Sequence, residues 1–406
     1  MKLLYVIDQK PDGYPGGIEY HQLDLIGYCA GRGIPVSLLF PEQKSLCLRS
    51  YRDGGVEETR YKGGKRDDHR LRDRETEEIF RKILHETDTD IVHFQSIRTL
   101  PLSLIEAAKH AGKKVLVSIH EYYFWCINCI MLAPDFCWFE KDTKKCAECL
   151  AREGPTVTEG YIEERRQYIN ALFGMIDRVI TPSFYVRDVF LWLYGGLTED
   201  KCSVIQFGVD RGILQDGREK PARPANGILN LAFLGNFLHY KGNKAFLALA
   251  NHYQHSDSLR FSIIGNIFDF GLIPSHANLS VAGGYTRNNV VRKIQKVDPD
   301  VILLFSNWPE TFSYTLSEAI AAGVPVIATD GGALRERVSR ESVGFLVPVE
   351  NPVPRTVEII EDLRLNPGVI DFFKEKVNTA RTRLKTVEDM AEEMFRIYQS
   401  LLQRTL

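Results

Sequence analysis

The chain has 406 residues, with 51 Lys and Arg against 53 Asp and Glu, so its formal charge is −2. This length exceeds what one core usually holds, and we expect two domains of roughly 150 to 200 residues. The balanced charge argues against the basic surface with which nucleic-acid-binding proteins hold phosphates. We therefore expect no nucleic-acid partner, and we expect any anionic ligand to be bound by a few local groups.

The chain begins MKLLYVIDQK, and its five apolar residues before Asp8 are too few for a signal peptide or a membrane span. No later run approaches the roughly 18 uninterrupted apolar residues that a span needs. Cysteines spaced as C-x-x-C without a secretory signal favour a reducing compartment. We expect a cytoplasmic protein, and peripheral contact with the inner face of a membrane stays open.

The first half alternates short apolar runs with amphipathic segments, as parallel strands joined by helices do. The mixed charges of residues 60–90 predict a solvated helix face. We expect a doubly wound domain over residues 1–208, with a cysteine-rich insertion at 121–153. Its expected strands are 3–8, 34–40, 90–95, 113–120, 178–183 and 203–208, and its expected helices are 16–33, 71–86 and 101–112.

The second half repeats the alternation after residues 209–228, which are rich in Gly, Pro and charge and predict a linker. A second α/β domain is expected over 229–385, and a helix over 386–406 that packs back toward the N-terminal domain. Two Rossmann-like domains in tandem should face each other across a ligand cleft, because open parallel sheets bind ligands at the carboxyl ends of their strands. The expected strands are 229–236, 260–266, 279–283, 300–306, 324–330 and 343–348.

Two loops that follow expected strands could hold a phosphate. Gly16 and Gly17, in PDGYPGGIEYH, would let backbone amides approach an anion at a helix start, although two glycines there more often make only a turn. Lys241 stands before the next helix in LGNFLHYKGN and could reach a diphosphate as a point charge. By itself it could equally be one more surface lysine.

The stretch NWPETFSYTLSEAIAAGVPVIATDGG places Glu310 and Glu318 eight residues apart around the start of a small-residue helix. That separation suits the reach from ribose to hexose in a nucleotide sugar. A structural alternative is a capping box from Thr315 to Glu318. The backbone amides that could cradle a diphosphate at this helix start belong to Ser313, Tyr314, Thr315 and Leu316.

With these motifs in order, the chain resembles a family-four glycosyltransferase of the GT-B fold. The resemblance covers nearly the whole chain and rests on the E-x7-E pair, on EAIAAGVPVIATDGGALRERV, and on the motifs LGN...KG, FGVD and PGGIEYH. It implies transfer of a glycosyl unit from a nucleotide-diphosphate sugar to a glycan or lipid-linked glycan. It also implies retention of the anomeric configuration and no metal at the reaction centre.

Carried over by position, the resemblance implies that Glu310 contacts the donor hexose and Glu318 the ribose. Lys241 would hold the diphosphate with help from Gly17 and the amides after Phe312. His120, which closes the expected strand 113–120, matches the active-site histidine of the family. Without the resemblance, a strand-end histidine bonded to backbone would be the simpler interpretation of His120.

Asn236 departs from the family pattern, because many relatives carry Arg at this position of the donor site. Arg335 or Arg337 could substitute for the missing cation, or the donor could bind more weakly. This departure supports one alternative, a catalytically inactive protein of the same fold that binds nucleotide sugars or acts as a scaffold. A redox-active or nucleic-acid-binding metalloprotein is a third interpretation, against which the near-neutral charge argues.

Five of the eight cysteines lie within residues 121–150. Two C-x-x-C pairs joined by a loop are typical of a closed structural zinc site, and an iron–sulfur cluster would use the same ligands. Free thiols are the non-metal alternative. A cysteine-bearing subset of the family implies Cys126, Cys137, Cys146 and Cys149 as ligands, with Cys129 as a possible substitute. The aromatic residues of this segment either line an acceptor pocket or pack against the core.

Overall fold

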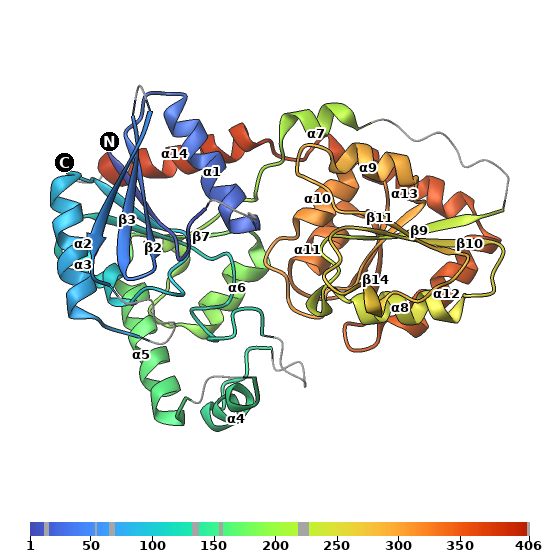
Figure 1. Cartoon of the computed structure of the whole chain (residues 1–406), viewed down its shortest axis with the longest axis horizontal. Helices are drawn as coiled ribbons and strands as arrows, with labels where there is room; N and C mark the ends of the chain where they lie inside the picture. The colour runs from blue at the N-terminus through green and yellow to red at the C-terminus, as the bar shows by residue number, and fades with distance from the viewer. Residues whose placement is uncertain are drawn as a thin grey trace. The chain divides into compact units, whose positions relative to one another are not determined.

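The computed structural model describes residues 1–11, 16–52, 55–64, 70–131, 138–153, 157–217 and 227–403 (Figure 1). The chain divides into two compact units. The first unit comprises residues 1–133, 139–206 and 388–406, and the second comprises residues 134–138 and 207–387.

The first unit is built on an eight-stranded sheet in the order β4-β3-β2-β1-β5-β6-β7-β8. The pairs from β2 through β1 to β8 are parallel, and their apolar residues are buried because helices cover parallel sheets on both faces. The strands are β1 (Leu3–Val6), β2 (Val36–Glu42), β3 (Ser45–Arg52), β4 (Gly55–Lys62), β5 (Ile91–Phe94), β6 (Lys114–Ser118), β7 (Arg178–Thr181) and β8 (Cys202–Val204).

The antiparallel hairpin of β3 and β4 was not expected from the sequence. Its two strands pair from Ser45 with Lys62 to Arg52 with Gly55. Most of β4 is exposed, so its sequence GVEETRYK lacks the apolar run by which the buried strands are recognised. The hairpin lengthens the sheet on the side away from β5.

The helices of this unit include those expected over 16–33, 71–86, 101–112 and 386–406, and several more. They are α1 (Gly17–Ala30), α2 (Arg74–Glu86), α3 (Ser103–His110), α4 (Thr143–Glu153), α5 (Glu159–Met175), α6 (Phe184–Leu193), the short η1 (Glu199–Lys201) and the C-terminal α14 (Val387–Gln403). In Figure 1 the red helix α14 lies among the blue elements of the first unit. The Tyr398 hydroxyl of α14 lies 3.1 Å from that of Tyr5 on β1, both buried.

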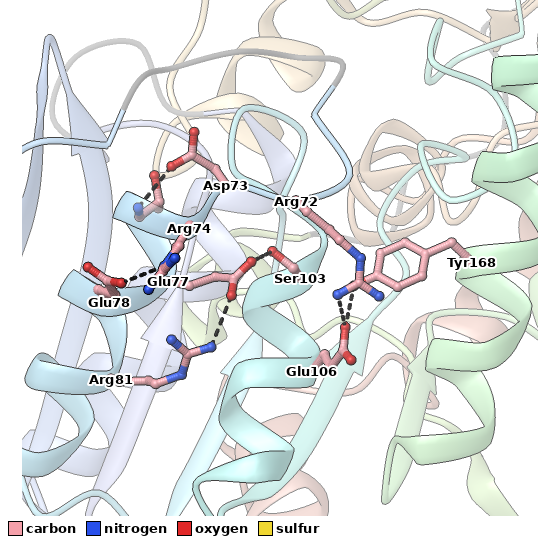
Figure 2. A network of polar contacts seen from close by, with 10 residues as sticks. Arg72, Asp73, Arg74, Glu77, Glu78, Arg81, Ser103, Glu106 and Tyr168 are labelled. Atoms are coloured by element: carbon pink, nitrogen blue, oxygen red, sulfur yellow. Dashed lines mark hydrogen bonds and ion pairs between the residues drawn. The ribbon is translucent and has the colours of Figure 1, made fainter.

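The charged residues expected on a solvated helix face also tie neighbouring helices together (Figure 2). Glu106 of α3 accepts hydrogen bonds from Arg72, at 2.6 Å, and from the hydroxyl of Tyr168 on α5, at 2.7 Å. Ser103 of α3 donates to Glu77 of α2 at 2.6 Å. Partly exposed pairs of this kind are individually worth at most about 1 kcal/mol, so they orient helices whose apolar faces supply most of the stability.

The second unit has a six-stranded, fully parallel sheet in the order β11-β10-β9-β12-β13-β14. Its strands are β9 (Leu229–Leu234), β10 (Leu259–Ile264), β11 (Leu279–Gly283), β12 (Val301–Leu304), β13 (Val326–Thr329) and β14 (Gly344–Val347). Its helices are α7 (Arg211–Asp216), η2 (His239–Lys241), α8 (Asn243–His252), η3 (Phe270–Leu272), α9 (Val290–Val297), α10 (Tyr314–Ala321), α11 (Gly332–Glu341), α12 (Pro352–Leu365) and α13 (Gly368–Arg381).

The core of the second unit has two layers, one on each face of the sheet. Alternate residues of β9 point to opposite faces, so Phe233 packs in the layer that holds Phe246 and Ile360, whereas Leu234 packs in the layer that holds Ile294. Together with the first sheet, this arrangement confirms the expectation of two Rossmann-like α/β domains and a C-terminal helix.

The predicted linker, residues 209–228, begins within the second unit rather than as an extended connection. Asp210 caps α7 by accepting a hydrogen bond from Gly212 N at 2.7 Å, and Val209 forms a β-bridge with Thr386. Residues 218–226 of the predicted linker lie outside the described residues. Among the described helices, none combines the length and the apolar character needed to cross a membrane.

Candidate functional site

The centre of the candidate donor site is an ion pair in the second unit. The Lys241 Nζ lies 2.7 Å from Oε1 of Glu310, and the Glu310 side chain is 4% exposed. The Ser306 hydroxyl donates to the same oxygen. Glu310 thus receives both bonds on Oε1, which leaves Oε2 without a hydrogen bond from any residue that the structure describes.

Two glycines make this ion pair possible. Gly242 follows Lys241 with φ +82°, and a Cβ atom there would lie 2.1 Å from the Phe305 carbonyl oxygen. Gly332 has φ +59°, and its Cβ would lie 2.6 Å from the backbone of Glu310. Only glycine fits these positive φ values and close approaches. Because Gly242 and Gly332 have no side chains, their loops can come close to the carboxyl ends of β9 and β12.

Glu318 lies on α10 and accepts a hydrogen bond from the Tyr285 hydroxyl at 3.0 Å. Burial raises the pKa of Glu318 to about 7, although Tyr285, Arg287 and Lys241 act in the opposite direction. The capping-box alternative is wrong, because the N-cap of α10 is Ser313. Glu318 therefore turns toward the loop after β11, and Tyr285 is a site residue that the sequence analysis missed.

The start of α10 is held in a strained conformation by its own cap and by a buried arginine. Ser313 has φ +72°, which is costly for a residue with a side chain, and its hydroxyl accepts from Leu316 N at 3.4 Å. Arg337 donates to the carbonyl oxygens of Phe312 and Ser313 at 2.9 and 2.8 Å. Burial lowers the pKa of Arg337 to about 10.

These contacts determine which amides and cations remain for an anion. The Leu316 amide already serves the cap, whereas Tyr314 and Thr315 begin the helix beside it. Arg337 is committed to the loop carbonyls, so it does not replace the missing family arginine. Arg335 is 67% exposed and lies 3.4 Å from Asp330.

Asn236, at the position where the resemblance implies an arginine, is joined by a second amide. The Asn266 side chain donates to Oδ1 of Asn236 at 3.0 Å. Both residues follow neighbouring parallel strands, since Asn236 comes after β9 and Asn266 after β10. A neutral amide pair can bind a phosphate oxygen through an N–H group, but it adds no positive charge.

His120 belongs to the first unit, at the carboxyl end of β6. Its Nε2 lies 2.7 Å from Oε1 of Gln95, and its ring is 4.9 Å from that of His21 in an edge arrangement. Burial lowers the pKa of His120 to about 3, which keeps the imidazole neutral at ordinary pH. Nε2 thus has a side-chain partner, whereas the simpler interpretation expected a bond to the backbone.

Gly16 and Gly17 stand at the start of α1, which also carries His21. The Gly16 amide donates to Oε2 of Glu19 at 2.8 Å, which is the glutamate half of a capping box. That amide is therefore satisfied within the chain, beside a carboxylate. The expectation that Gly16 donates to a phosphate would require Glu19 to move, whereas Gly17 forms the first residue of the helix.

The cysteines separate into two groups. Burial raises the pKa of the Cys126 thiol to about 11, and Cys146 and Cys149 are close enough that their charges raise it as well. Cys129 turns away, because its sulfur donates to the Ile127 carbonyl at 3.3 Å and interacts with the side chains of Arg98 and Glu121. Cys137 lies outside the described residues.

A metal fits this cluster only in part. Cys146 and Cys149 lie one turn apart on α4, as ligands of a common ion often do, but their sulfurs and that of Cys126 do not all lie within 4.8 Å of one another. Among the described residues, such a compact group is formed by Glu42, Cys47 and Glu58. Arginines pair with both of these carboxylates, so ion pairs already neutralise that group.

The aromatic residues after His120 form core rather than an open pocket. Tyr122 and Tyr123 are at most 1% exposed, and Tyr122 stacks on Phe190 of α6. Arg165 of α5 donates to the Tyr123 carbonyl. On α6, by contrast, Trp192 is 58% exposed, so that helix presents an aromatic residue to solvent.

Two family models match the chain, one in each half. Residues 15–212 match Glycosyltransferase Family 4, and residues 219–368 match Glycosyl transferases group 1. The fold, with one Rossmann-like domain under each model, therefore defines a glycosyltransferase of the GT-B class. Within that class the chain belongs to family four, as the motifs indicated.

A curated relative agrees with this assignment, and solved structures share the fold. Over 298 residues the chain is 23% identical to the Escherichia coli protein named "Putative colanic acid biosynthesis glycosyl transferase WcaC", covering 68% of this chain and 70% of that protein. The structure is similar to sucrose-phosphate synthase from Thermosynechococcus elongatus, with a TM-score of 0.67 and 15% identity over the full length of both chains. It is also similar to Anabaena HepE in complex with UDP, with a TM-score of 0.63 and 14% identity over 98% of this chain and 100% of that chain.

Proposed function

We propose that the protein transfers a hexosyl unit from a nucleotide-diphosphate sugar to a glycan or lipid-linked glycan, with retention of configuration. The observation that carries this proposal is the Lys241–Glu310 pair with Glu318 nearby. These groups form a cationic point for the diphosphate and two carboxylates for sugar hydroxyls. The second oxygen of Glu310 is the acceptor that a hexose hydroxyl would use, and Glu318 is the corresponding group for the ribose.

Departure of a nucleoside diphosphate builds negative charge, which a fixed cation and helix amides stabilise. We propose that Lys241 passes from Glu310 to the diphosphate when the donor binds, with the first amides of α10 beside it. His120, neutral and hydrogen-bonded to Gln95, would act toward the reacting sugar. In a front-face reaction the leaving phosphate itself accepts the proton of the acceptor hydroxyl, so no carboxylate pair for inversion is needed.

The relatives indicate which substrates to try first. HepE was solved with UDP, so UDP-sugars are the first donors. The name of WcaC refers to colanic acid biosynthesis, and a surface polysaccharide intermediate is therefore our first acceptor class. A lipid-linked acceptor would suit the exposed Trp192 of α6, and it would place the protein at the inner face of a membrane.

The test is release of free nucleoside diphosphate from a panel of nucleotide sugars, with and without acceptors. We expect release with one donor, and we expect Glu310→Gln to abolish it while the melting temperature stays near that of the unaltered protein. The anomeric configuration of the product, read by NMR, tests retention. Near-normal turnover of Glu310→Gln would contradict the role of this carboxylate.

The amide pair of Asn236 and Asn266 supports the second candidate, a protein that binds nucleotide sugars without transferring them. A protein of this kind would be stabilised by a nucleotide sugar and would release no nucleoside diphosphate with any acceptor. Binding and release therefore distinguish the two candidates. Asn236→Arg, which restores the family cation, should tighten donor binding if the diphosphate lies at this position.

We also propose a structural zinc held by Cys126, Cys137, Cys146 and Cys149. A closed four-thiolate site would tie α4 to the loop after His120 and lower the cost of ordering that loop. The orientation of Cys129 toward Arg98 and Glu121 supports its exclusion from the ligand set. Zinc in such a site is structural, so it takes no part in transfer.

A further inference from the structure

A series of buried hydrogen bonds runs through the first unit from the C-terminal helix to His120. The Tyr398 hydroxyl lies 2.7 Å from Nδ1 of His93 on β5. The amide nitrogen of Gln95 lies 3.3 and 3.4 Å from the two ring nitrogens of His93, both of which already have a hydroxyl partner. It therefore contacts the face of the ring, which attracts N–H groups. The Gln95 oxygen in turn lies 2.7 Å from Nε2 of His120. His93 and Tyr398 are 305 positions apart in the chain, and their contact links the C-terminal helix to the surroundings of the candidate active-site histidine.

The direction of these bonds determines the tautomer of His120. A carboxamide oxygen only accepts hydrogen bonds, so the hydrogen of a neutral His120 ring is on Nε2. The lone pair is then on Nδ1, and the ring can accept a proton or a hydroxyl hydrogen bond there. A neutral imidazole with the opposite tautomer would present a donor instead.

The amide of Gln95 could rotate by half a turn, and His93 opposes that rotation. Both ring nitrogens of His93 have hydroxyl partners, since Ser118 lies 2.8 Å from Nε2 and Tyr398 lies 2.7 Å from Nδ1. The ring is therefore held in one orientation, and its electron-rich face favours the NH₂ group of Gln95 over the carbonyl oxygen that a rotated amide would place there. His93, Gln95 and Tyr398 are each 1% exposed, so water does not compete for these bonds and their geometry is expensive to break.

We propose that Gln95 is a positioning residue that keeps His120 in the Nε2–H tautomer, and that Tyr398 of the C-terminal helix, acting through His93, keeps Gln95 in the required orientation. The consequence for transfer rests on the proposed function, because it needs His120 to meet a sugar hydroxyl. The tautomer itself does not depend on that function. The C-terminal helix then takes part in the organisation of the site as well as in the packing of the first unit.

The first readout uses no substrate. Imidazole ¹⁵N NMR distinguishes the protonated from the unprotonated ring nitrogen, and His120→Gln identifies the His120 signals among the ten histidines. We expect the unaltered protein to show the Nε2–H form. Gln95→Leu should shift the population toward the other tautomer or a mixture. Gln95→Glu should restore the Nε2–H form, because its oxygen still accepts. Tyr398→Phe should give a smaller shift in the same direction as Gln95→Leu.

A matched control is Tyr168→Phe. The hydroxyl of Tyr168, like that of Tyr398, forms a 2.7 Å hydrogen bond, but it donates to Glu106 in the network of Figure 2. That network has no part in the His120 series. Tyr168→Phe should leave the His120 signals unchanged. Signals of the Nδ1–H form in the unaltered protein would overturn the proposal, as would signals unaffected by both Gln95→Leu and Tyr398→Phe. Tyr398→Phe decides the matter if Gln95→Leu does not fold.

The second readout is kinetic and uses whichever donor the unaltered protein consumes. Misplacement of an active-site group by about 1 Å can cost roughly 100-fold in rate, so we expect kcat of Gln95→Leu to fall by up to that factor with the donor KM unchanged. Gln95→Glu should recover part of the loss. An unchanged kcat beside a shifted tautomer would overturn the role in transfer. If no donor is consumed at all, the proposed function fails, while the NMR result still decides the tautomer.

Discussion

The ammonium group of Lys241 lies 2.7 Å from Oε1 of Glu310, although the two residues are 69 positions apart in the chain. Each group neutralises the other in the absence of a donor. A diphosphate that binds Lys241 would therefore compete with Glu310, and the carboxylate so released would be free to accept from a sugar hydroxyl. Under the proposed function, the ion pair would be a resting arrangement that keeps two functional groups in place until the donor arrives.

Removal of this lysine should lower both stability and nucleotide binding. Lys241→Met leaves the buried Glu310 carboxylate without its cation, at a cost of about 1 to 3 kcal/mol, and we expect the double variant Lys241→Met/Glu310→Gln to recover most of that loss. The measurement is urea unfolding of the single and double variants. Equal stability of Lys241→Met and the unaltered protein would contradict the importance of the pair.

The same variant should lose its response to nucleoside diphosphate. A ligand at about 100 times its Kd adds roughly 2.7 kcal/mol of stability, so the thermal shift of the unaltered protein should be large and that of Lys241→Met small. Lys244→Met is the matched control, because Lys244 is exposed and lies three residues further along the chain, on α8. A similar loss of response in both variants would indicate a general charge effect instead.

The stability of the protein should depend on pH through Glu318. Its pKa of about 7 in the folded protein exceeds the ordinary value of 4.5, so the folded state retains a proton that the unfolded state releases. This difference removes stability as the pH rises from about 4.5 through about 7, by up to about 3 kcal/mol. Below that window both states are protonated and nothing is lost.

Glu318→Gln removes this penalty, and the variant should exceed the unaltered protein in melting temperature at pH 8 but much less at pH 5. Its affinity for nucleotide should fall, as expected for a group that binds ribose. Glu358→Gln serves as a control, since that side chain is 63% exposed on α12. A stability gain for Glu318→Gln that is equal at both pH values would argue against a raised pKa.

Zinc content should distinguish the cysteines that bind the metal from Cys129. Elemental analysis should find about one zinc per chain, and Cys146→Ser should lose zinc and stability with little change in donor affinity. Cys129→Ser should retain zinc, because that thiol points to Arg98 and Glu121. Equal loss of zinc from both variants would show that Cys129 is a ligand.

Gly242 should tolerate no side chain. Gly242→Ala places a methyl group 2.1 Å from the Phe305 carbonyl oxygen at a positive φ, whereas Gly112→Ala has a positive φ of 71° but meets nothing within 4 Å. We expect Gly242→Ala to cost about 1 to 3 kcal/mol more than Gly112→Ala, with weaker nucleotide binding. Chemical unfolding of the two variants measures the difference. Equal costs would show that the loop relaxes freely.

The buried strands and the helices can be predicted from local sequence, because they depend on patterns within a few residues. Buried parallel strands such as LLYV and VIAT are continuous apolar runs, and their alternation with helices predicts Rossmann-like domains. The hairpin of β3 and β4 is not predicted by this pattern, because β4 is exposed and charged. The sequence predicts a helix start near Ser313, but the capping-box alternative would place the N-cap at Thr315. The actual N-cap is Ser313, two residues earlier, in a strained conformation that only its surroundings maintain.

Partners contributed by distant segments could not be inferred in this way. The E-x7-E pair and Lys241 are predicted as candidates from their motifs. No local pattern, however, predicts that Tyr285 donates to Glu318 or that Gln95 accepts from His120. Nor does one predict that Arg337 donates to loop carbonyls. The sequence alone predicts the two domains, the glycosyltransferase family and the candidate groups of the site. The orientation, protonation and available oxygens of those groups come from tertiary structure, because hydrogen-bond partners and desolvation depend on which strand ends and helices meet in space.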